Sequence, residues 1–228
     1  MARPTIILFD IDGTLVLTGG AGRRAMERAC GVLLGDPRAC AAFTMAGMTD
    51  RAIVRRACQA AGKADHPELL DQMIDAYLAV LPDELARSTA FRILAGGHSL
   101  ITKLSTYRHI AVGLGTGNVR RGAAHKLGHA GLWSATTFGG FGCDAEDRGT
   151  LIRRGAERGA AQLGMPLADC RVIVVGDTLF DIQAAVSNQF LCVAVATGGA
   201  TAVDLTTGGA DYVATSLEDS GILEFLLL

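Results

Sequence analysis

Two carboxylates stand two residues apart at the end of a short apolar run near the start of the chain. The run Ile6–Phe9 leads into Asp10-Ile11-Asp12-Gly13-Thr14, a pattern that predicts a buried strand opening into an acidic site. Residues i and i+2 of an extended chain face the same way, so Asp10 and Asp12 would repel each other unless a cation lies near or one carboxyl keeps its proton. Asp-Gly is also a common hairpin turn, and the residues downstream decide between the two interpretations.

A hydroxyl and an amide follow a second strand-like run. Thr116, Gly117 and Asn118 come directly after residues 110–115. At the start of a helix, such residues offer a hydroxyl and backbone N–H groups to a phosphate oxygen. Thr and Asn also cap helices without any ligand, so these three residues indicate a phosphate site only in combination with the others.

More acid follows a third run. Asp177 and Asp181 come after residues 171–176, and either could serve as a helix cap. If the strands are parallel, however, these acids reach the same sheet edge as Asp10 and Asp12. A cluster of three carboxylates needs a hard cation such as Mg²⁺.

The elements that must position these residues alternate along the chain. Alternation of strand-like and helix-length segments predicts an α/β fold with a doubly wound parallel, Rossmann-like sheet, and such sheets bind ligands beyond the carboxyl ends of their strands. The expected strands are residues 5–10, 110–115, 171–176, 191–196 and 211–214.

An inserted helical segment interrupts this alternation. The sequence predicts helices over residues 21–34, 50–61 and 67–81, between glycine-containing loops at 18–20 and 95–97. We therefore expect a catalytic core of residues 1–18 and 95–228 and an all-helical cap domain of residues 19–94.

Composition excludes several classes of protein. Half of the 228 residues are apolar and the formal charge is −2, with the basic residues scattered in doublets, so a nucleic-acid partner is not expected. No apolar run approaches the roughly 20 residues that span a bilayer.

The six cysteines form no Cys-x-x-Cys pair and no secretory segment is recognised, which favours a cytoplasmic protein. His125 and His129 are expected to be surface residues, and both a monomer and a homodimer are compatible with the sequence.

The order of these motifs resembles that of the haloacid dehalogenase superfamily, in particular phosphatase-type members with a helical cap, similar to phosphoglycolate phosphatase and beta-phosphoglucomutase. Residues 10–14 resemble the first motif, 116–118 the second and 176–181 the fourth. The third motif usually supplies Lys, whereas this chain has Arg148 in the matching segment. Relatives often end the helix after the fourth motif with Gly; here Asn188 is expected to adopt the left-handed conformation instead.

The resemblance implies a role for each residue. Asp10 would be the nucleophile that forms an aspartyl phosphate, and Asp12 would be the general acid and then the general base. Mg²⁺ would be held by Asp10, the backbone carbonyl of Asp12 and Asp177, with Asp181 orienting Arg148 or the metal shell. Phosphoryl oxygens would bind Thr116, Gly117, Asn118 and, in a bidentate manner, Arg148. In the cap, Thr49 and Asp50 would approach the leaving group, unless they only begin a helix.

The expected activity is Mg²⁺-dependent hydrolysis of a small phosphorylated metabolite. Asp12 favours phosphate esters over haloacids, because dehalogenation needs no proton donor for its leaving group. Three alternatives use similar residues: a phosphomutase of the beta-phosphoglucomutase type, a phosphoaccepting signalling module, and a binding protein that has lost turnover.

Overall fold

A six-stranded parallel sheet forms the centre of the larger part of the molecule. The computed structural model describes residues 3–136 and 138–228. The sheet has the order β5-β4-β1-β6-β7-β8, with β1 between strands that lie far from it in sequence. The strands across the sheet are β5 (Gly139–Phe141), β4 (Ile110–Thr116), β1 (Thr5–Phe9), β6 (Arg171–Gly176), β7 (Leu191–Val195) and β8 (Tyr212–Ala214). This architecture confirms the predicted α/β fold with a parallel sheet.

Helices cover both faces of the sheet, so alternate residues of each strand enter different apolar cores. Ile7 and Phe9 of β1 lie in one core, and Ile6 and Leu8 lie in the other. The first core includes residues of α4 (Gly97–Leu104), α5 (Arg120–His129) and α9 (Ser220–Leu227), and the second includes residues of α6 (Arg148–Leu163), α7 (Leu179–Ser187) and α8 (Ala202–Thr207). Burial on both faces explains why the strands are almost uniformly apolar.

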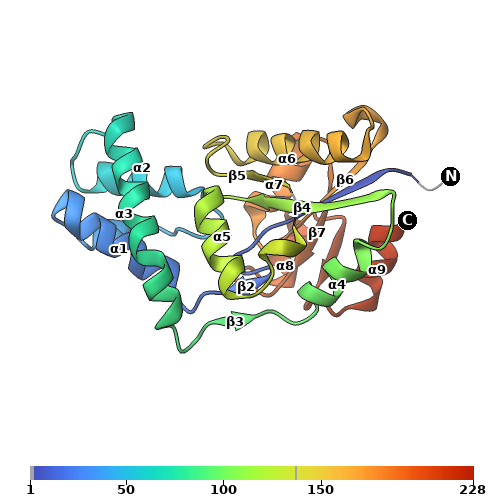
Figure 1. Ribbon diagram of the computed structural model, residues 1–228, viewed down its shortest axis with the longest axis horizontal. Helices are drawn as coiled ribbons and strands as arrows, with labels where there is room; N and C mark the ends of the chain where they lie inside the picture. Colours follow the sequence, from blue (N-terminus) through green and yellow to red (C-terminus); the bar gives the residue numbers. More distant parts are fainter. Residues whose placement is uncertain (1–2, 137) are drawn as a thin grey trace.

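Three helices gather at one end of the molecule, beyond the carboxyl end of β1 (Figure 1). They are α1 (Ala21–Leu34), α2 (Asp50–Ala60) and α3 (Pro67–Ala86), and we call residues 21–86 the helical unit. The unit has an apolar core of its own, to which Met26, Val54 and Leu70 contribute, and Val119 from the sheet side joins it. The existence and place of these helices follow the sequence prediction; the exact division at residues 18/19 and 94/95 stays a prediction.

The two connections to the helical unit pair with each other. β2 (Val16–Leu17) and β3 (Arg92–Ile93) form a two-stranded antiparallel sheet. Short 3₁₀ helices complete the described elements, at Ala39–Ala42, Trp133–Ala135 and Leu167–Asp169. Across residues 3–136 and 138–228, none of the helices is both long and apolar enough to cross a membrane.

Two local expectations were wrong. The third helix does not stop at Leu81 but continues through Pro82 to Ala86, because Leu85 is buried in the core of the helical unit and Glu84 is bound by two arginines of α1. After α7, Asn188 is not left-handed; the positive φ, 59°, belongs to Gln189. The Asn188 side chain donates hydrogen bonds to the carbonyls of Gly149 and Ala184 instead.

Candidate active site

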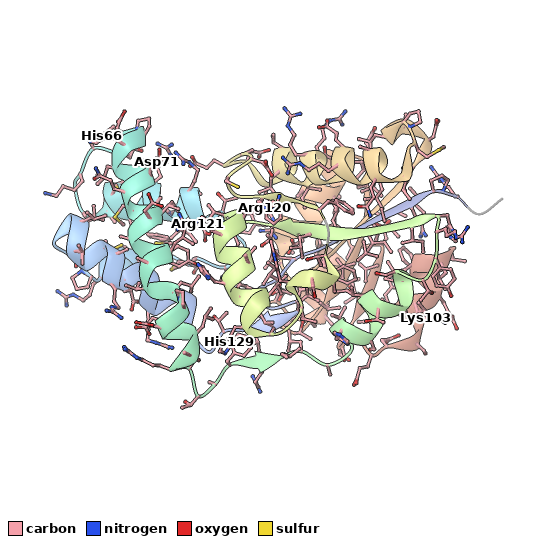
Figure 2. All side chains as sticks on the ribbon, in the orientation of Figure 1. His66, Asp71, Lys103, Arg120, Arg121 and His129 are labelled. Carbon is pink, nitrogen blue, oxygen red and sulfur yellow. The ribbon has the colours of Figure 1, made fainter. Side chains whose placement is uncertain are left out.

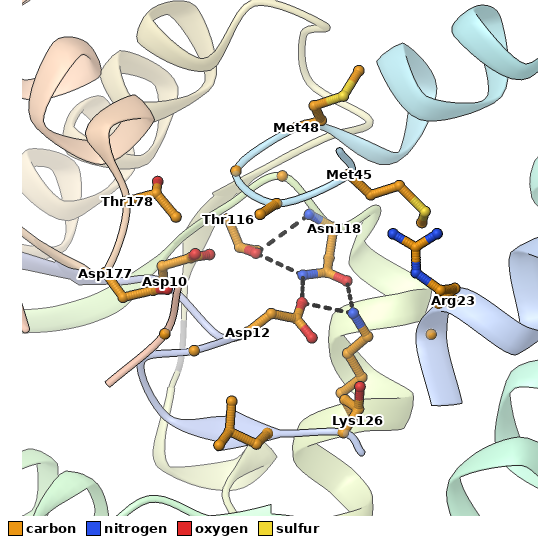
Figure 3. A pocket seen from close by; sticks show the side chains of 18 of the residues that line it. Asp10, Asp12, Arg23, Met45, Met48, Thr116, Asn118, Lys126, Asp177 and Thr178 are labelled. Atoms are coloured by element: carbon orange, nitrogen blue, oxygen red, sulfur yellow. Dashed lines mark hydrogen bonds and ion pairs between the residues drawn. The ribbon is translucent and has the colours of Figure 1, made fainter. Parts of the chain in front are cut away.

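The two aspartates of the first motif face different cations. Figure 3 shows the contact between Asp12 and Lys126. Asp10 follows β1 directly and is buried, whereas the Asp12 side chain is 41% exposed. Arg148 Nη2 lies 3.0 Å from Asp10 Oδ2, and Lys126 Nζ lies 2.6 Å from Asp12 Oδ2. The repulsion expected between Asp10 and Asp12 is therefore relieved by two separate cations, one for each carboxylate.

Arg148 occupies the first turn of α6 and is itself buried. Its guanidinium also donates to Asp181 Oδ1, at 3.1 Å from Nε and 2.5 Å from Nη2, and Nη1 donates to the carbonyl of Gly47 at 3.1 Å. Arg148 thus lies next to Asp10, the predicted nucleophile. All three guanidinium nitrogens already have partners, so a bidentate grip on phosphate would require one of these contacts to break.

Three buried carboxylates converge where the first and fourth motifs meet. Oxygens of Asp10, Asp177 and Asp181 lie within 4.8 Å of one another. Burial raises the pKa of Asp10 to about 6, although Arg148 partly opposes the shift, and burial together with the charges of Asp10 and Asp181 raises the pKa of Asp177 to about 8. In both groups, burial and repulsion between the carboxylates outweigh the positive charge of Arg148.

The residues present fit a small hard cation. Carboxylate oxygens are the ligands Mg²⁺ prefers, and the Asp177 carboxylate is packed so tightly against Gly13 and Gly198 that a Cβ at either glycine would overlap it. Gly13 also has a φ of 85°, which side-chain-bearing residues rarely adopt. Both oxygens of Asp181 already accept hydrogen bonds, from Arg148 and from Thr178. Asp181 therefore contacts the predicted anion-binding arginine directly.

The second motif lies on the other side of Asp10. Thr116, the last residue of β4, is fully buried, and its hydroxyl accepts a hydrogen bond of 2.8 Å from the Asn118 side-chain amide. The same amide nitrogen donates to Asp12 Oδ2 at 2.8 Å. The backbone of Gly117 approaches the helical unit: its carbonyl accepts from the Asp50 N–H at 2.8 Å, and a Cβ here would lie 2.5 Å from the carbonyl oxygen of Met48.

Thr49 and Asp50 join the helical unit to the sheet side. The Thr49 oxygen caps α2 by accepting from the Ala52 N–H, and its hydroxyl donates to the Glu146 carbonyl at 3.0 Å. Asp50 is buried, and its Oδ2 accepts from the Val119 N–H at the start of α5 at 2.8 Å. Asp50, rather than Thr116 or Asn118, therefore provides the hydrogen-bond acceptor for the backbone N–H group at the start of that helix.

A cavity of about 530 Å³ lies over these residues. The carboxyl ends of β1, β4 and β6 form its floor, and side chains of the helical unit form its roof. Asp50 lines this cavity, whereas Thr49 lies outside it. Its lining from the helical unit includes Arg23, Met26, Met45, Met48, Ile53 and Tyr77. A small molecule bound over Asp10 would therefore contact both parts of the protein.

Sequence reasoning missed Lys126. This residue lies on α5, is buried, and donates 2.6 Å hydrogen bonds to Asp12 Oδ2 and Asn118 Oδ1. A signal was present: Lys126 is four residues after Gly122 and three after Ala123, on the buried face of the helix. A lysine on an apolar helix face requires a partner in the interior. By contrast, neither His125 nor His129 belongs to a metal-ligating group among the described residues.

Known proteins share the fold of this chain. No curated protein sequence matches the chain. Solved structures with the same fold include a hydrolase from Pseudomonas syringae (TM-score 0.69, 18% identity, 95% of each chain covered). A predicted phosphatase from Clostridium acetobutylicum has a TM-score of 0.70 at 18% identity over 99% of each chain. A beta-phosphoglucomutase from Clostridium difficile has a TM-score of 0.69 at 18% identity, over 99% of this chain and 97% of the other.

At these identities the solved structures establish the fold alone. The family is shown by sequence, because the model of the haloacid dehalogenase-like hydrolases matches residues 7–195. This range contains all four motifs described above, from Asp10 to Asp181. The chain belongs to the haloacid dehalogenase-like hydrolase family.

Proposed function

We propose that this protein is a Mg²⁺-dependent phosphatase that hydrolyses a small phosphate monoester through an aspartyl phosphate. One observation carries the proposal: Asp10 lies buried between Arg148 and two further carboxylates, while Asp12, two residues later, faces the cavity. Asp10 is therefore suited to act as the nucleophile beside charged groups, and Asp12 is suited to exchange a proton with a ligand in the cavity.

In the first step, a carboxylate oxygen of Asp10 attacks the phosphorus atom. An oxygen–phosphorus bond forms to Asp10, the ester bond breaks, and Asp12 gives its proton to the leaving oxygen. Thr116, the backbone of Gly117, Asn118 and Arg148 surround the phosphoryl oxygens. For Arg148, whose nitrogens are all engaged, we propose that substrate replaces the Gly47 carbonyl as the partner of Nη1.

In the second step, water attacks the phosphorus of the aspartyl phosphate. Asp12 accepts a proton from this water, inorganic phosphate leaves, and the Asp10 carboxylate is regenerated. Asp10, the backbone carbonyl of Asp12 and Asp177 would hold Mg²⁺, with Asp181 fixing Arg148 beside them. When bound, the cation supplies positive charge to the phosphoryl oxygens.

The test is Mg²⁺-dependent phosphate release from a panel of small monoesters, including phosphoglycolate and hexose phosphates. We expect release that disappears on chelation and falls at least 10³-fold in Asp10→Asn, since covalent catalysis is then lost. Asp204→Asn is the matched control: this exposed acid caps α8, outside the cavity lining. Absence of release from every ester would refute the proposal.

Product analysis separates hydrolysis from phosphoryl return to a sugar. If a hexose phosphate is isomerised instead of releasing phosphate, the protein is a mutase with the same nucleophile.

We also propose a cytoplasmic location, which is supported by six cysteines that are all free thiols.

A further inference from the structure

The buried ammonium group of Lys126 lines the cavity, and the mechanism above does not use it. It reaches from α5 to Asp12 Oδ2 and Asn118 Oδ1, at 2.6 Å each (Figure 3). The side chain is 6% exposed. Burying an ammonium group is costly unless it is fully hydrogen-bonded, so the contacts of this group are informative.

Tyr77 of α3, in the helical unit, is a neighbour of the same ammonium group. Its buried side chain lines the cavity and interacts electrostatically with Lys126. A lysine ammonium has three N–H donors, and Lys126 donates to Asp12 and Asn118. Lys126 can therefore act on the reaction through these two partners.

Asp12 is the partner that matters for the chemistry. Its Oδ2 accepts from both Lys126 and the Asn118 amide, which fixes the carboxyl plane and leaves Oδ1 for the substrate. Tyr77, the neighbour of Lys126, belongs to the helical unit. The surroundings of the Lys126–Asp12 pair therefore come from both parts of the molecule.

We propose that Lys126 is a positioning residue that, together with Tyr77, aims the Asp12 carboxyl at the leaving-group oxygen. The inference rests on the proposed phosphatase activity and adds a specific requirement to it. Loss of the Lys126 contacts should impair proton delivery to the leaving group without impairing attack by Asp10. An ester whose leaving group needs no proton should then be almost insensitive to changes at Lys126.

The experiment compares two esters in each protein variant. One is p-nitrophenyl phosphate, whose acidic leaving group departs unprotonated, and the other is the best alkyl phosphate of the panel. We expect Lys126→Met to lower kcat/KM about 100-fold for the alkyl ester, the usual contribution of a positioned general acid, and less than about 5-fold for the aryl ester. The ratio of the two values does not depend on the fraction of folded protein.

Two further variants make the result decisive. Tyr77→Phe removes only a hydroxyl from a residue whose ring stays packed, and it should lower the same ratio in the same direction by a smaller factor. Lys103→Met is the matched control, because Lys103 is an exposed lysine on α4, far from the helical unit (Figure 2). Its ratio should equal that of the wild type.

Equal losses on both esters in Lys126→Met and Tyr77→Phe would overturn the inference and show that the contacts only support folding. If Lys126→Met does not fold, Tyr77→Phe alone decides. A wild type that hydrolyses neither ester would instead refute the phosphatase proposal, and the two failures are therefore distinguishable.

Discussion

Arg148 binds Asp10 and Asp181 in the interior, and each contact has a different consequence. The contact with Asp10 balances the charge of the proposed nucleophile, whereas the contacts with Asp181 tie α6 to α7. Removing a cation from a buried group of this kind leaves uncompensated carboxylates, which costs more than the net strength of the ion pair itself. Arg148 is therefore expected to affect both stability and turnover.

Replacing Arg148 by Met tests this dual role. We expect Arg148→Met to lower the free energy of unfolding by about 3–5 kcal/mol and kcat by about 10²–10³-fold. Urea unfolding and phosphate release measure the two effects. Arg153→Met is the control on the same helix, since Arg153 is 57% exposed and its pair with Glu157 is 3.5 Å long; this change should stay within about 0.5 kcal/mol. Similar unfolding midpoints for the two variants would contradict the buried role of Arg148.

Asp50 gives the protein a predictable pH dependence. Burial raises the pKa of Asp50 from 3.8 to about 6, with Lys126 opposing the shift. The folded state holds the Asp50 proton more tightly than the unfolded state does. Protonation of Asp50 therefore adds to the free energy of unfolding in full below about pH 4, and this addition is lost as the pH rises through about 6.

Asp50→Asn removes this titration and keeps an oxygen for the Val119 N–H. Between pH 4.5 and 7, we expect the stability of the variant to rise relative to that of the wild type, by on the order of 2 kcal/mol. Urea unfolding at several pH values measures the difference. A difference that stays constant or falls over this range would show that Asp50 is already ionised at the acid end.

At the level of elements, the sequence predicted the regular parts well. Uniformly apolar runs identified β1, β4, β6 and β7 to within a residue or two, because strands buried on both faces contain little else. The three residues of β5 and the pairs that form β2 and β3 are too short to show a periodicity. They exist because a neighbouring strand or linker offers hydrogen bonds, which a local pattern does not reveal.

The residues of the candidate site also fall into two groups, those that the sequence predicted and those that it did not. The sequence predicted that Asp10, Asp12, Thr116 and Asp177 lie close together, because each stands at or just after the end of a strand and a parallel sheet brings such positions to one edge. Lys126 lies two helical turns beyond Asn118, and the role of Asp50 at the start of α5 depends on how the helical unit packs. These contacts arise from tertiary packing, which residue spacing alone did not determine.

Thr49 joins two elements, and its contribution can be measured. Thr49→Val keeps the shape of the side chain but loses the α2 cap and the hydrogen bond to the Glu146 carbonyl. We expect a loss of about 1–2 kcal/mol in the free energy of unfolding, measured by urea unfolding. Thr49→Ser keeps the hydroxyl and should recover most of this loss; if Ser and Val behave alike, the hydroxyl contributes nothing.

At the scale of the whole molecule, metal binding should couple to folding and to pH. A cation that binds the folded chain stabilises it by about 2.7 kcal/mol at 100 times its Kd, which corresponds to a rise in Tm of about 5–10 °C for a chain of this size. Since the pKa of Asp177 is raised to about 8, Mg²⁺ must displace a proton at lower pH, and its effect should be greater at pH 8.5 than at pH 6.5.

Thermal unfolding with and without Mg²⁺, at matched ionic strength, checks this expectation. Asp177→Asn should abolish the Mg²⁺-dependent rise in Tm at both pH values. A rise that is independent of pH, or one that persists in Asp177→Asn, would place the cation elsewhere.

The position of β1 in the sheet has a consequence for synthesis of the protein. β1 is made first, yet its two neighbours are β4 and β6, which begin at residues 110 and 171. At translation rates of about 5–20 residues per second, roughly 10–30 s separate the synthesis of β1 from that of β6. During that time the whole helical unit is synthesised, together with all residues of its apolar core except Val119 as one continuous stretch of the chain. β1 cannot pair within the sheet until β4 and β6 have been synthesised. The acidic pocket is therefore among the last features that a nascent chain can complete.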